Sequence, residues 1–393
     1  MSPQPPRARE HYWDALRAGL MLLGIPYHVA LSYRPGEQWI VRSGEGWAPF
    51  TWLAELIHVF RMPAFFIIAG YFAALLLARR APGKWFKGRF VRLGVPFAAA
   101  IVTLVPIMNL ACEFSNLPYS EALSSFVWNS THSGGYWVRH LWFIIVLLYL
   151  SSAAAALVAA LPRWAKASVP ERIDRLCADN FLTALLAAAL LIGIWEAVAV
   201  ELFYIGGLAT QLPQQILRID ELIIYAPWFA LGCLLQRMPR TIARVGRFSW
   251  PIAGIAAIGL LLSFTIVDAL HPAPGRALVT FAALAISQLL IAGARTLLDR
   301  PSALMGRLTD ASYVIYLLHL PVITILVWLG QGIAMPAALK GLLVMLLATA
   351  ISYVGWLAIA RSGVLAFLYN GTTRAGALKA APVPSGRAEP LPG

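Results

Sequence analysis

An apolar segment near the N-terminus, DALRAGLMLLGIPYHVALSY, carries three ionisable side chains: Asp14, Arg17 and His28. An ionisable group inside a membrane helix costs roughly 2.5–3.5 kcal/mol, so such groups are usually retained for a function. At about 100° per residue, Arg17 lies about 300° from Asp14 and His28 lies about 20° from Arg17, so the three share one stripe. The segment therefore predicts a single helix that lines a polar channel or an active site.

Further ionisable residues fall at a similar predicted depth in other apolar segments. At 1.5 Å per residue, His28 lies about 22 Å along its helix, in the outer third of a hydrocarbon core about 30 Å thick. The next span returns from outside, which puts His58 about 10 Å and Arg61 about 15 Å below the outer face. The other members of this layer are Glu196, His140 and Trp142. Together they predict one buried polar site that opens outward.

The two arginines also have structural interpretations. Arg17 can reach the inner membrane surface with its long side chain. Arg61 lies too deep to do so easily and serves either a function or an ion pair, for which Glu196 is the candidate partner. The sequence leaves these alternatives open.

The histidines have a similar alternative, since His28 and His319 can each be packing residues. Pro26 precedes His28 by two positions and removes a backbone hydrogen bond, which predicts a kink. Kinked helices are common where a membrane helix lines a cavity. This favours a site role for His28, whereas His319, in SYVIYLLHLP, stays undecided.

Membrane helices must position these groups. The chain has 393 residues, 60% of them hydrophobic and 12% charged, which excludes an ordinary soluble globular domain. Its apolar stretches predict an all-α, polytopic membrane protein with about ten transmembrane helices. The expected spans are 13–33, 51–78, 90–110, 139–161, 181–203, 221–236, 249–270, 277–295, 311–329 and 338–360.

Charges in the connections predict the orientation of these spans. Six basic residues and no acid occupy 79–92, whereas the first, third, seventh and ninth connections hold at most two basic residues each. Because Lys and Arg accumulate on cytoplasmic loops, both termini should be cytoplasmic, and the net charge of +13 is mainly a topology signal. The sequence shows no basic soluble domain, which argues against a nucleic-acid partner. We expect one transmembrane domain at 1–370 and a disordered cytoplasmic tail at 371–393.

The basic stretch at 79–92 has a second interpretation besides topology. Arg and Lys side chains bind phosphates through charge-assisted hydrogen bonds, so this stretch could hold a polyanionic cofactor such as a nucleotide diphosphate. The sequence has no glycine-rich phosphate loop, which argues against a P-loop or dinucleotide fold. Its three cysteines lie on separate segments and predict neither a metal site nor a disulfide framework.

Five segments, in this order along the chain, resemble the acyltransferase-3 family of membrane enzymes. They are DALRAGLMLLGIPYHVALSY, HVFRMPAFFIIAGYF, KWFKGRFVRLGVP, HLWFIIVLLYL and SYVIYLLHLP. The resemblance implies a ten-helix fold that moves acyl groups from cytoplasmic acyl-coenzyme A to sugars on the far side of the membrane. The pairing of LMLLGIPYH with FRMPAFFIIAGYF is most similar to the glucan biosynthesis protein C branch, which implies succinyl transfer to osmoregulated periplasmic glucans.

The resemblance also implies roles for matching positions. The family's key histidine falls on His28, its helix-one arginine on Arg17, and the arginine before FF-x-x-x-GY on Arg61. Many relatives end in a fused extracytoplasmic domain, whereas a short tail follows the last span here. Acceptor binding is therefore expected from loops and helix ends.

Other matches concern the donor and the lining of the site. The R-x-x-R-x-x-x-P element, which the family places near the donor's phosphates, matches Arg89, Arg92 and Pro96. Trp142 matches the tryptophan of H-L-W-F, and His319 the histidine of Y-x-x-H. The expected acyl-coenzyme A contacts are Arg17, Arg89, Arg92, Lys84 and Lys87. The expected acceptor or site-lining residues are His58, Glu196, His140, Trp142, Tyr316 and His319.

The residues and the resemblance agree on an acyl transfer. We expect His28 to deprotonate a glucosyl hydroxyl as it attacks the thioester of succinyl-coenzyme A. Arg61 either stabilises the oxyanion or holds the succinyl carboxylate. No serine or cysteine stands beside His28 in a nucleophile motif, so direct attack is favoured over an acyl-histidine intermediate.

The expected surroundings follow from this interpretation. The protein should be a multi-pass protein of the bacterial inner membrane, with its donor arriving from the cytoplasm and its glucan acceptor from the periplasm. We expect no metal and no permanently bound cofactor; the lipid bilayer and other glucan biosynthesis proteins are the further partners. The alternatives are an acetyl-coenzyme A dependent O-acetyltransferase of a surface polysaccharide and a secondary transporter or exporter.

Overall fold

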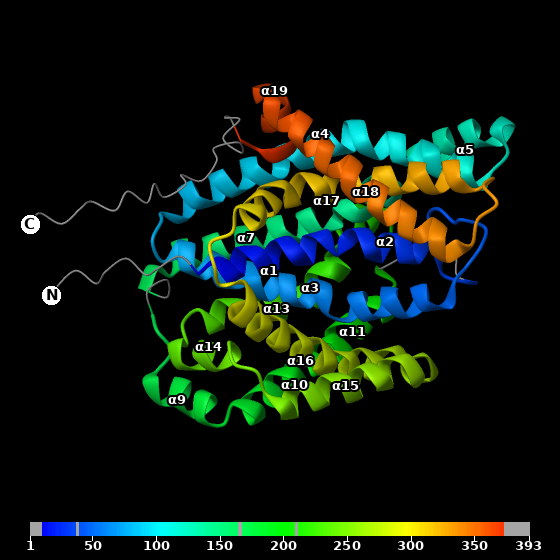
Figure 1. Cartoon of the computed structure of the whole chain (residues 1–393). Helices are drawn as coiled ribbons and strands as arrows, with labels where there is room; N and C mark the ends of the chain where they lie inside the picture. Colours follow the sequence, from blue (N-terminus) through cyan, green and yellow to red (C-terminus); the bar gives the residue numbers. More distant parts are fainter. Residues whose placement is uncertain (1–9, 37–38, 164–166, 209–210, 373–393) are drawn as a thin grey trace, which may run out of the picture.

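The computed structural model describes residues 10–36, 39–163, 167–208 and 211–372, and all regular elements among them are helical (Figure 1). The first half contains α1 (His11–Leu22), α2 (Gly24–Tyr33), α3 (Ala48–Leu77), α4 (Pro82–Asn116), α5 (Tyr119–His132), α6 (Gly135–Val138), η1 (Arg139–Leu141), α7 (Trp142–Ala160), α9 (Glu171–Asp179) and α10 (Phe181–Trp195). The second half contains η2 (Glu196–Val200), α11 (Glu201–Ile205), α12 (Leu212–Leu217), α13 (Ile219–Leu235), α14 (Pro239–Val245), α15 (Trp250–Thr265), η4 (Val267–Ala269), α16 (Pro272–Leu298), α17 (Ala303–Gly330), α18 (Ala337–Arg361) and α19 (Gly363–Asn370). The predicted all-α class is confirmed.

Eight helical spans in the described part of the chain are long and apolar enough to cross a membrane. They are α1–α2, α3, α4, α6–α7, α10–α11, α16, α17 and α18. The sixth predicted span corresponds to α13, which is followed by a bend of 114° into α14. The seventh corresponds to α15, an apolar helix of 16 residues. A polytopic membrane protein is confirmed, and the tail predicted at 371–393 lies outside the described residues except for its first two.

The first span is two helices and not the single helix that the sequence predicted. α1 ends at Leu22 and α2 begins at Gly24, and Leu23 between them keeps a right-handed helical conformation. Pro26 explains the break, because it has no backbone N–H to donate to the carbonyl of Leu22. The N–H of Leu23 still bonds to the carbonyl of Gly19, and that of Tyr27 to the carbonyl of Leu23, so α1 and α2 follow one another as one span of 23 residues.

The helix α3 lies at the centre of the bundle and is the most buried of the eight spans. It crosses α13 where Gly70 faces the carbonyl of Phe229 and Gly232 faces the carbonyl of Ile67. A β-carbon on either glycine would overlap the facing carbonyl group, so only glycine permits this approach. This close crossing fixes the position of the α3 side chains relative to α13.

The connections gather at two ends of the bundle. One end, here called the basic end, holds the α3–α4 turn with Arg79 and Arg80, together with α9 and α14, at the left of Figure 1. The end of α19 lies there too, because the backbone of Gly371 packs against that of Arg92. The connections before α3 and after α15 lie at the opposite end. This separation is typical of a membrane protein whose basic loops share one side.

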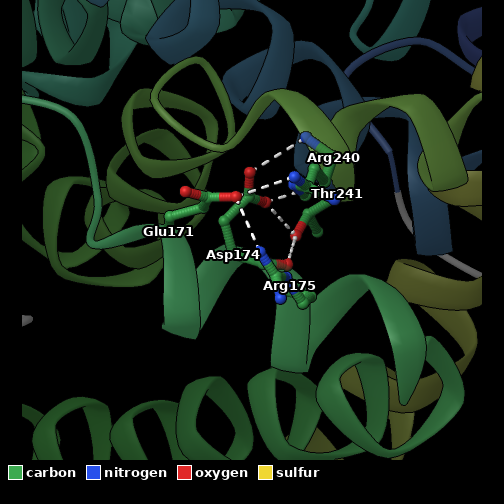
Figure 2. Close-up of polar contacts among 5 residues, drawn as sticks. All are labelled: Glu171, Asp174, Arg175, Arg240 and Thr241. Carbon is green, nitrogen blue, oxygen red and sulfur yellow. Dashed lines mark hydrogen bonds and ion pairs between the residues drawn. The ribbon is translucent and has the colours of Figure 1, made fainter.

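At the basic end, α9 and α14 are held together by polar contacts (Figure 2). The carboxylate of Asp174 accepts hydrogen bonds from the backbone N–H groups of Arg240 and Thr241, at 3.0 and 2.9 Å. It also accepts one from the Thr241 hydroxyl at 2.8 Å. Glu171 pairs with Arg175 and Arg240, each at 2.8 Å. Asp174 thus caps the start of α14 from a different helix.

Replacing Asp174 with alanine is expected to destabilise this contact by about 2 kcal/mol, since two helix-terminal N–H groups lose their acceptor. Burial alone would raise the pKa of the Asp174 carboxyl, but the hydrogen bonds from Arg240 and Thr241 outweigh burial and lower its pKa. The stabilisation is therefore present above the usual aspartate pKa and is lost as the pH falls through the lowered one. Thermal unfolding measures the loss, with the exposed Asp179→Ala as the control; equal melting curves for the two variants would contradict the assignment.

Candidate functional site

A cavity of about 990 Å³ lies among α2, α3, α7, α13, α16 and α17. Trp39, Gly135, Leu270 and Pro272 line it from connections and helix ends opposite the basic end, so the cavity reaches that side of the bundle. The residues of the predicted polar layer that line it are His28, His58, Arg61, His140, Trp142 and Glu196, and Tyr316 joins them.

Three histidine rings, each from a different span, lie close together: His28 and His140 line the cavity, whereas His319, predicted as a site-lining residue, is packed beside them and does not line it. The ring of His319 lies 5.2 Å from that of His28 and 5.4 Å from that of His140, measured between centroids. His319 is buried, and its Nδ1 lies 2.6 Å from the carbonyl oxygen of Tyr316. Because a carbonyl only accepts, this contact assigns the proton of a neutral His319 to Nδ1 and leaves Nε2 as an acceptor. His319 therefore belongs to the same constellation as His28.

Arg61 packs against an aromatic ring and not against an acid. Its guanidinium carbon lies 4.7 Å from the ring centroid of Tyr27, a favourable cation–π distance. The Tyr27 hydroxyl in turn lies 3.2 Å from Nδ1 of His58. Among the described residues, Arg61 makes no ion pair. The guanidinium thus brings positive charge to the cavity without a carboxylate beside it.

The alternative that Glu196 is the partner of Arg61 is wrong in this structure. One Glu196 oxygen accepts a hydrogen bond from Nε1 of Trp228 at 2.8 Å, and the other accepts from the Thr280 hydroxyl at 3.2 Å. Glu196 is nevertheless a lining residue of the cavity, as the sequence predicted. Its depth was predictable, whereas its direction depends on α13 and α16.

Gly24, at the start of α2, lies where two site residues approach the backbone. A β-carbon at this position would lie 3.0 Å from Nε2 of His319 and 3.1 Å from Nη1 of Arg61. These distances are shorter than ordinary van der Waals contacts, so a methyl group would have to displace one or both side chains. The absence of a side chain at Gly24 therefore lets His319 and Arg61 converge.

Replacing Gly24 with alanine is expected to lower the turnover of the acyl transfer predicted from the sequence about tenfold or more, because catalysis is sensitive to displacements below 1 Å. The helix itself should gain up to about 1 kcal/mol from the substitution, so unfolding is not the cause of the loss. Gly19→Ala is the matched control, since a β-carbon there meets no atom within 4 Å. Turnover measured on both variants decides, and equal activity would contradict the role of Gly24.

The residues predicted to contact acyl-coenzyme A lie at the basic end and not in the cavity. Arg89 donates to the Ser151 hydroxyl at 3.3 Å, and Arg17 and Arg92 are close enough to interact with it electrostatically. Arg17 also lies 3.5 Å from Asp14. The remaining two predicted contacts, Lys84 and Lys87, are exposed on α4. The arrangement concentrates positive charge around Arg89.

Sequence reasoning missed part of the cavity lining. Arg218, Glu221, Tyr225 and Trp228 come from the α12–α13 region, and Arg276 comes from the first turn of α16. Arg218, Glu221 and Arg276 stand at or beside the predicted ends of spans 221–236 and 277–295, where charges look like ordinary flanking residues. The sequence offers one weak indication of a site role for these residues, which is that Arg218 and Glu221 occur together at the end of a span.

Comparisons with known proteins place this chain in a family. The protein named Glucans biosynthesis protein C from Salmonella gallinarum is 29% identical over 336 residues, which cover 80% of this chain and 83% of the relative. Its namesakes are 30% identical over 337 residues in Salmonella schwarzengrund and 29% over 341 residues in Escherichia coli O81, with 80% and 82% of this chain covered and 83% of each relative. No solved structure matches. The acyltransferase-3 family model, described as an acyltransferase domain, matches residues 10–361, and the chain therefore belongs to the acyltransferase-3 family of membrane proteins.

Proposed function

We propose that this protein transfers succinyl groups from succinyl-coenzyme A to glucosyl hydroxyls of a periplasmic glucan, in the inner membrane of a bacterium. The family supports acyl transfer, and the name of the similar proteins supports a glucan acceptor. The observation that carries the succinyl donor is Arg61, which lines the same cavity as His28 and makes no ion pair among the described residues. A succinyl group differs from an acetyl group by a carboxylate, and arginine is the side chain best suited to bind it.

In the proposed reaction His28 is the general base. Its ring takes the proton of the attacking glucosyl hydroxyl while the hydroxyl oxygen bonds to the acyl carbon. The carbon–sulfur bond then breaks, and the coenzyme A thiolate leaves with the proton that His28 returns. Arg61 stabilises the oxyanion or holds the succinyl carboxylate during these steps. Nδ1 of His28 is buried without a hydrogen-bond partner in the described structure, so no protein group there competes for it.

A donor route from the basic end to the cavity accompanies this reaction. The phosphates of coenzyme A bind near Arg89, Arg92 and Arg17 in the proposal. The ring of Tyr313 stacks on that of Tyr316 at 6.3 Å, and the Tyr313 hydroxyl donates to the carbonyl of Leu93 on α4 at 3.3 Å. Tyr316 lines the cavity. The two tyrosines therefore mark a line along α17 that the pantetheine arm can follow.

Donor competition tests the proposal. Purified protein is given labelled succinyl-coenzyme A and acetyl-coenzyme A with neutral β-glucan, and the ester on the glucan is identified by mass. The proposal predicts succinyl esters in excess. Acetyl esters alone would instead make the protein an O-acetyltransferase, and no ester from either donor would support a transporter.

A further inference from the structure

One wall of the cavity has no role in the proposed chemistry, although its residues are polar and well ordered by contacts. This wall, here called the α13–α16 wall, consists of the lining residues Glu196, Arg218, Glu221, Trp228 and Arg276. It shares the cavity with His28 and Arg61. A group bound on this wall is therefore inside the same space as the proposed reaction.

An irregular turn brings Glu196 to this wall. Residues Glu196–Val200 form a π-helical turn between α10 and α11, an element that is rare and frequent at functional sites. Glu196 is 8% exposed, and the contacts with Trp228 and Thr280 described above fix both of its oxygens. The carboxylate is thus held in one orientation at the cavity, able to accept further hydrogen bonds.

A strained residue supplies the donor on the same wall. Arg218 joins α12 to α13 with φ +53° and ψ +46°, a left-handed conformation that is uncommon for a residue with a side chain. Gln214 supports this turn by accepting the backbone N–H of Ile219 at 3.0 Å. The guanidinium of Arg218 donates to Glu221 at 2.7 Å and to Asp220 at 3.3 Å. The residue with the left-handed backbone is therefore the one whose guanidinium holds a carboxylate cluster in place at the cavity.

The charges of the wall are balanced or negative. Arg218 is paired with Asp220 and Glu221, and Arg276 is paired with Glu201. Glu196 makes no ion pair among the described residues. The two arginines of this wall thus each face at least one carboxylate, and neither is left unpaired.

The rest of the cavity differs, because Arg61 on α3 and Arg139 at the start of η1 line it without an ion pair among the described residues. The cavity therefore has one region suited to an anionic group and another suited to a neutral one. The fixed carboxylates can accept hydrogen bonds from hydroxyl groups, and the paired arginine can donate hydrogen bonds to them. Trp228 and Tyr225 add aromatic surface to the same wall. A polyhydroxyl chain matches this chemistry.

We infer that the α13–α16 wall is the acceptor subsite, and that it selects uncharged glucosyl units over units that already carry an anionic substituent. The inference rests on the proposed function. A glucosyl unit that already bears a succinyl group would bring its carboxylate towards Glu196 and Glu221, where like charges repel it. Neutral units meet no such repulsion. The wall therefore directs acylation to unmodified parts of the glucan.

The test compares two acceptors, a neutral β-glucan and the same glucan succinylated chemically beforehand, with the purified full-length protein and succinyl-coenzyme A. The wild type should show a KM for the neutral glucan at least tenfold below that for the anionic one. Glu221→Gln and Glu196→Gln should each raise the KM for the neutral glucan roughly tenfold, the effect of one charge-assisted hydrogen bond, with a smaller change in kcat. Both variants should also discriminate less against the anionic glucan.

Glu121→Gln, an exposed acid on α5, is the matched control and should leave both KM values unchanged. Equal KM values of the wild type for the two glucans would overturn the inference without any variant, while the proposed function would stand. Gln variants that lose kcat but keep the wild-type KM and the discrimination between the two glucans would also overturn the inference. A wild type that succinylates neither glucan would instead overturn the proposed function, and the inference with it.

Discussion

Replacing His28 with alanine is expected to lower the turnover of succinyl transfer by about 10²–10⁴-fold, the usual contribution of a general base. His28 lines the cavity, whereas no serine or cysteine nucleophile motif stands beside it in the sequence. The acceptor hydroxyl would then have to attack without losing its proton. Turnover at saturating donor and acceptor measures the effect.

His132→Ala is the control for this prediction, since His132 is exposed on α5 and stacks on Trp128. It should retain full activity at a similar protein level. Normal turnover in His28→Ala would exclude His28 as the base. If His319→Ala lost activity in its place, the base would be His319, whose Nε2 lies beside Gly24 and has no hydrogen-bond partner in the described structure.

Replacing Arg61 with glutamine is expected to reduce succinyl transfer by about 10²-fold or more. The substitution removes a buried positive charge that would stabilise the oxyanion or bind the succinyl carboxylate. The two possible jobs of Arg61 differ in their effect on a second donor. An arginine that stabilises the oxyanion matters equally for succinyl- and acetyl-coenzyme A. An arginine that holds the succinyl carboxylate matters for succinyl-coenzyme A alone. Rates with both donors therefore measure the loss and assign the job.

Two further variants complete this comparison. Arg61→Lys keeps the charge but loses the planar, two-pronged donor geometry, so it should recover part of the activity. Arg42→Gln removes an exposed arginine from the connection between α2 and α3 and should change nothing. Unchanged succinyl transfer in Arg61→Gln would contradict the role of this residue.

The axial positions of the site residues could be predicted from the sequence. A constant rise per residue converts sequence position into depth, and the direction of each span follows from the basic connections. This is why His28, His58, Arg61, His140 and Glu196, which come from four spans, all line one cavity. The proline kink before His28 was predictable for the same local reason.

Positions around the helix axes could not be predicted in the same way. The stripe from Arg17 to His28 assumes an ideal helix, whereas Pro26 interrupts the backbone hydrogen bonds between α1 and α2. The direction of Glu196 depends on Trp228 and Thr280, which are distant in sequence.

The roles of charged residues at the ends of spans could not be predicted from the sequence either. Arg218 and Arg276 look like flanking residues until α13 and α16 bring them to the cavity. The contact between α9 and α14 depends on Asp174 and Thr241, 67 residues apart in the chain. No local pattern indicates such a pairing, because each partner looks like an ordinary polar surface residue in the sequence although both are buried.

Transfer across a sealed membrane tests the central claim most directly. The protein is reconstituted into vesicles that enclose neutral β-glucan, and labelled succinyl-coenzyme A is added outside. Because donor contacts are proposed at the basic end and the cavity reaches the opposite end, we predict label on the enclosed glucan with wild type and none with His28→Ala. Label that appears only when donor and glucan share the same side would contradict the account.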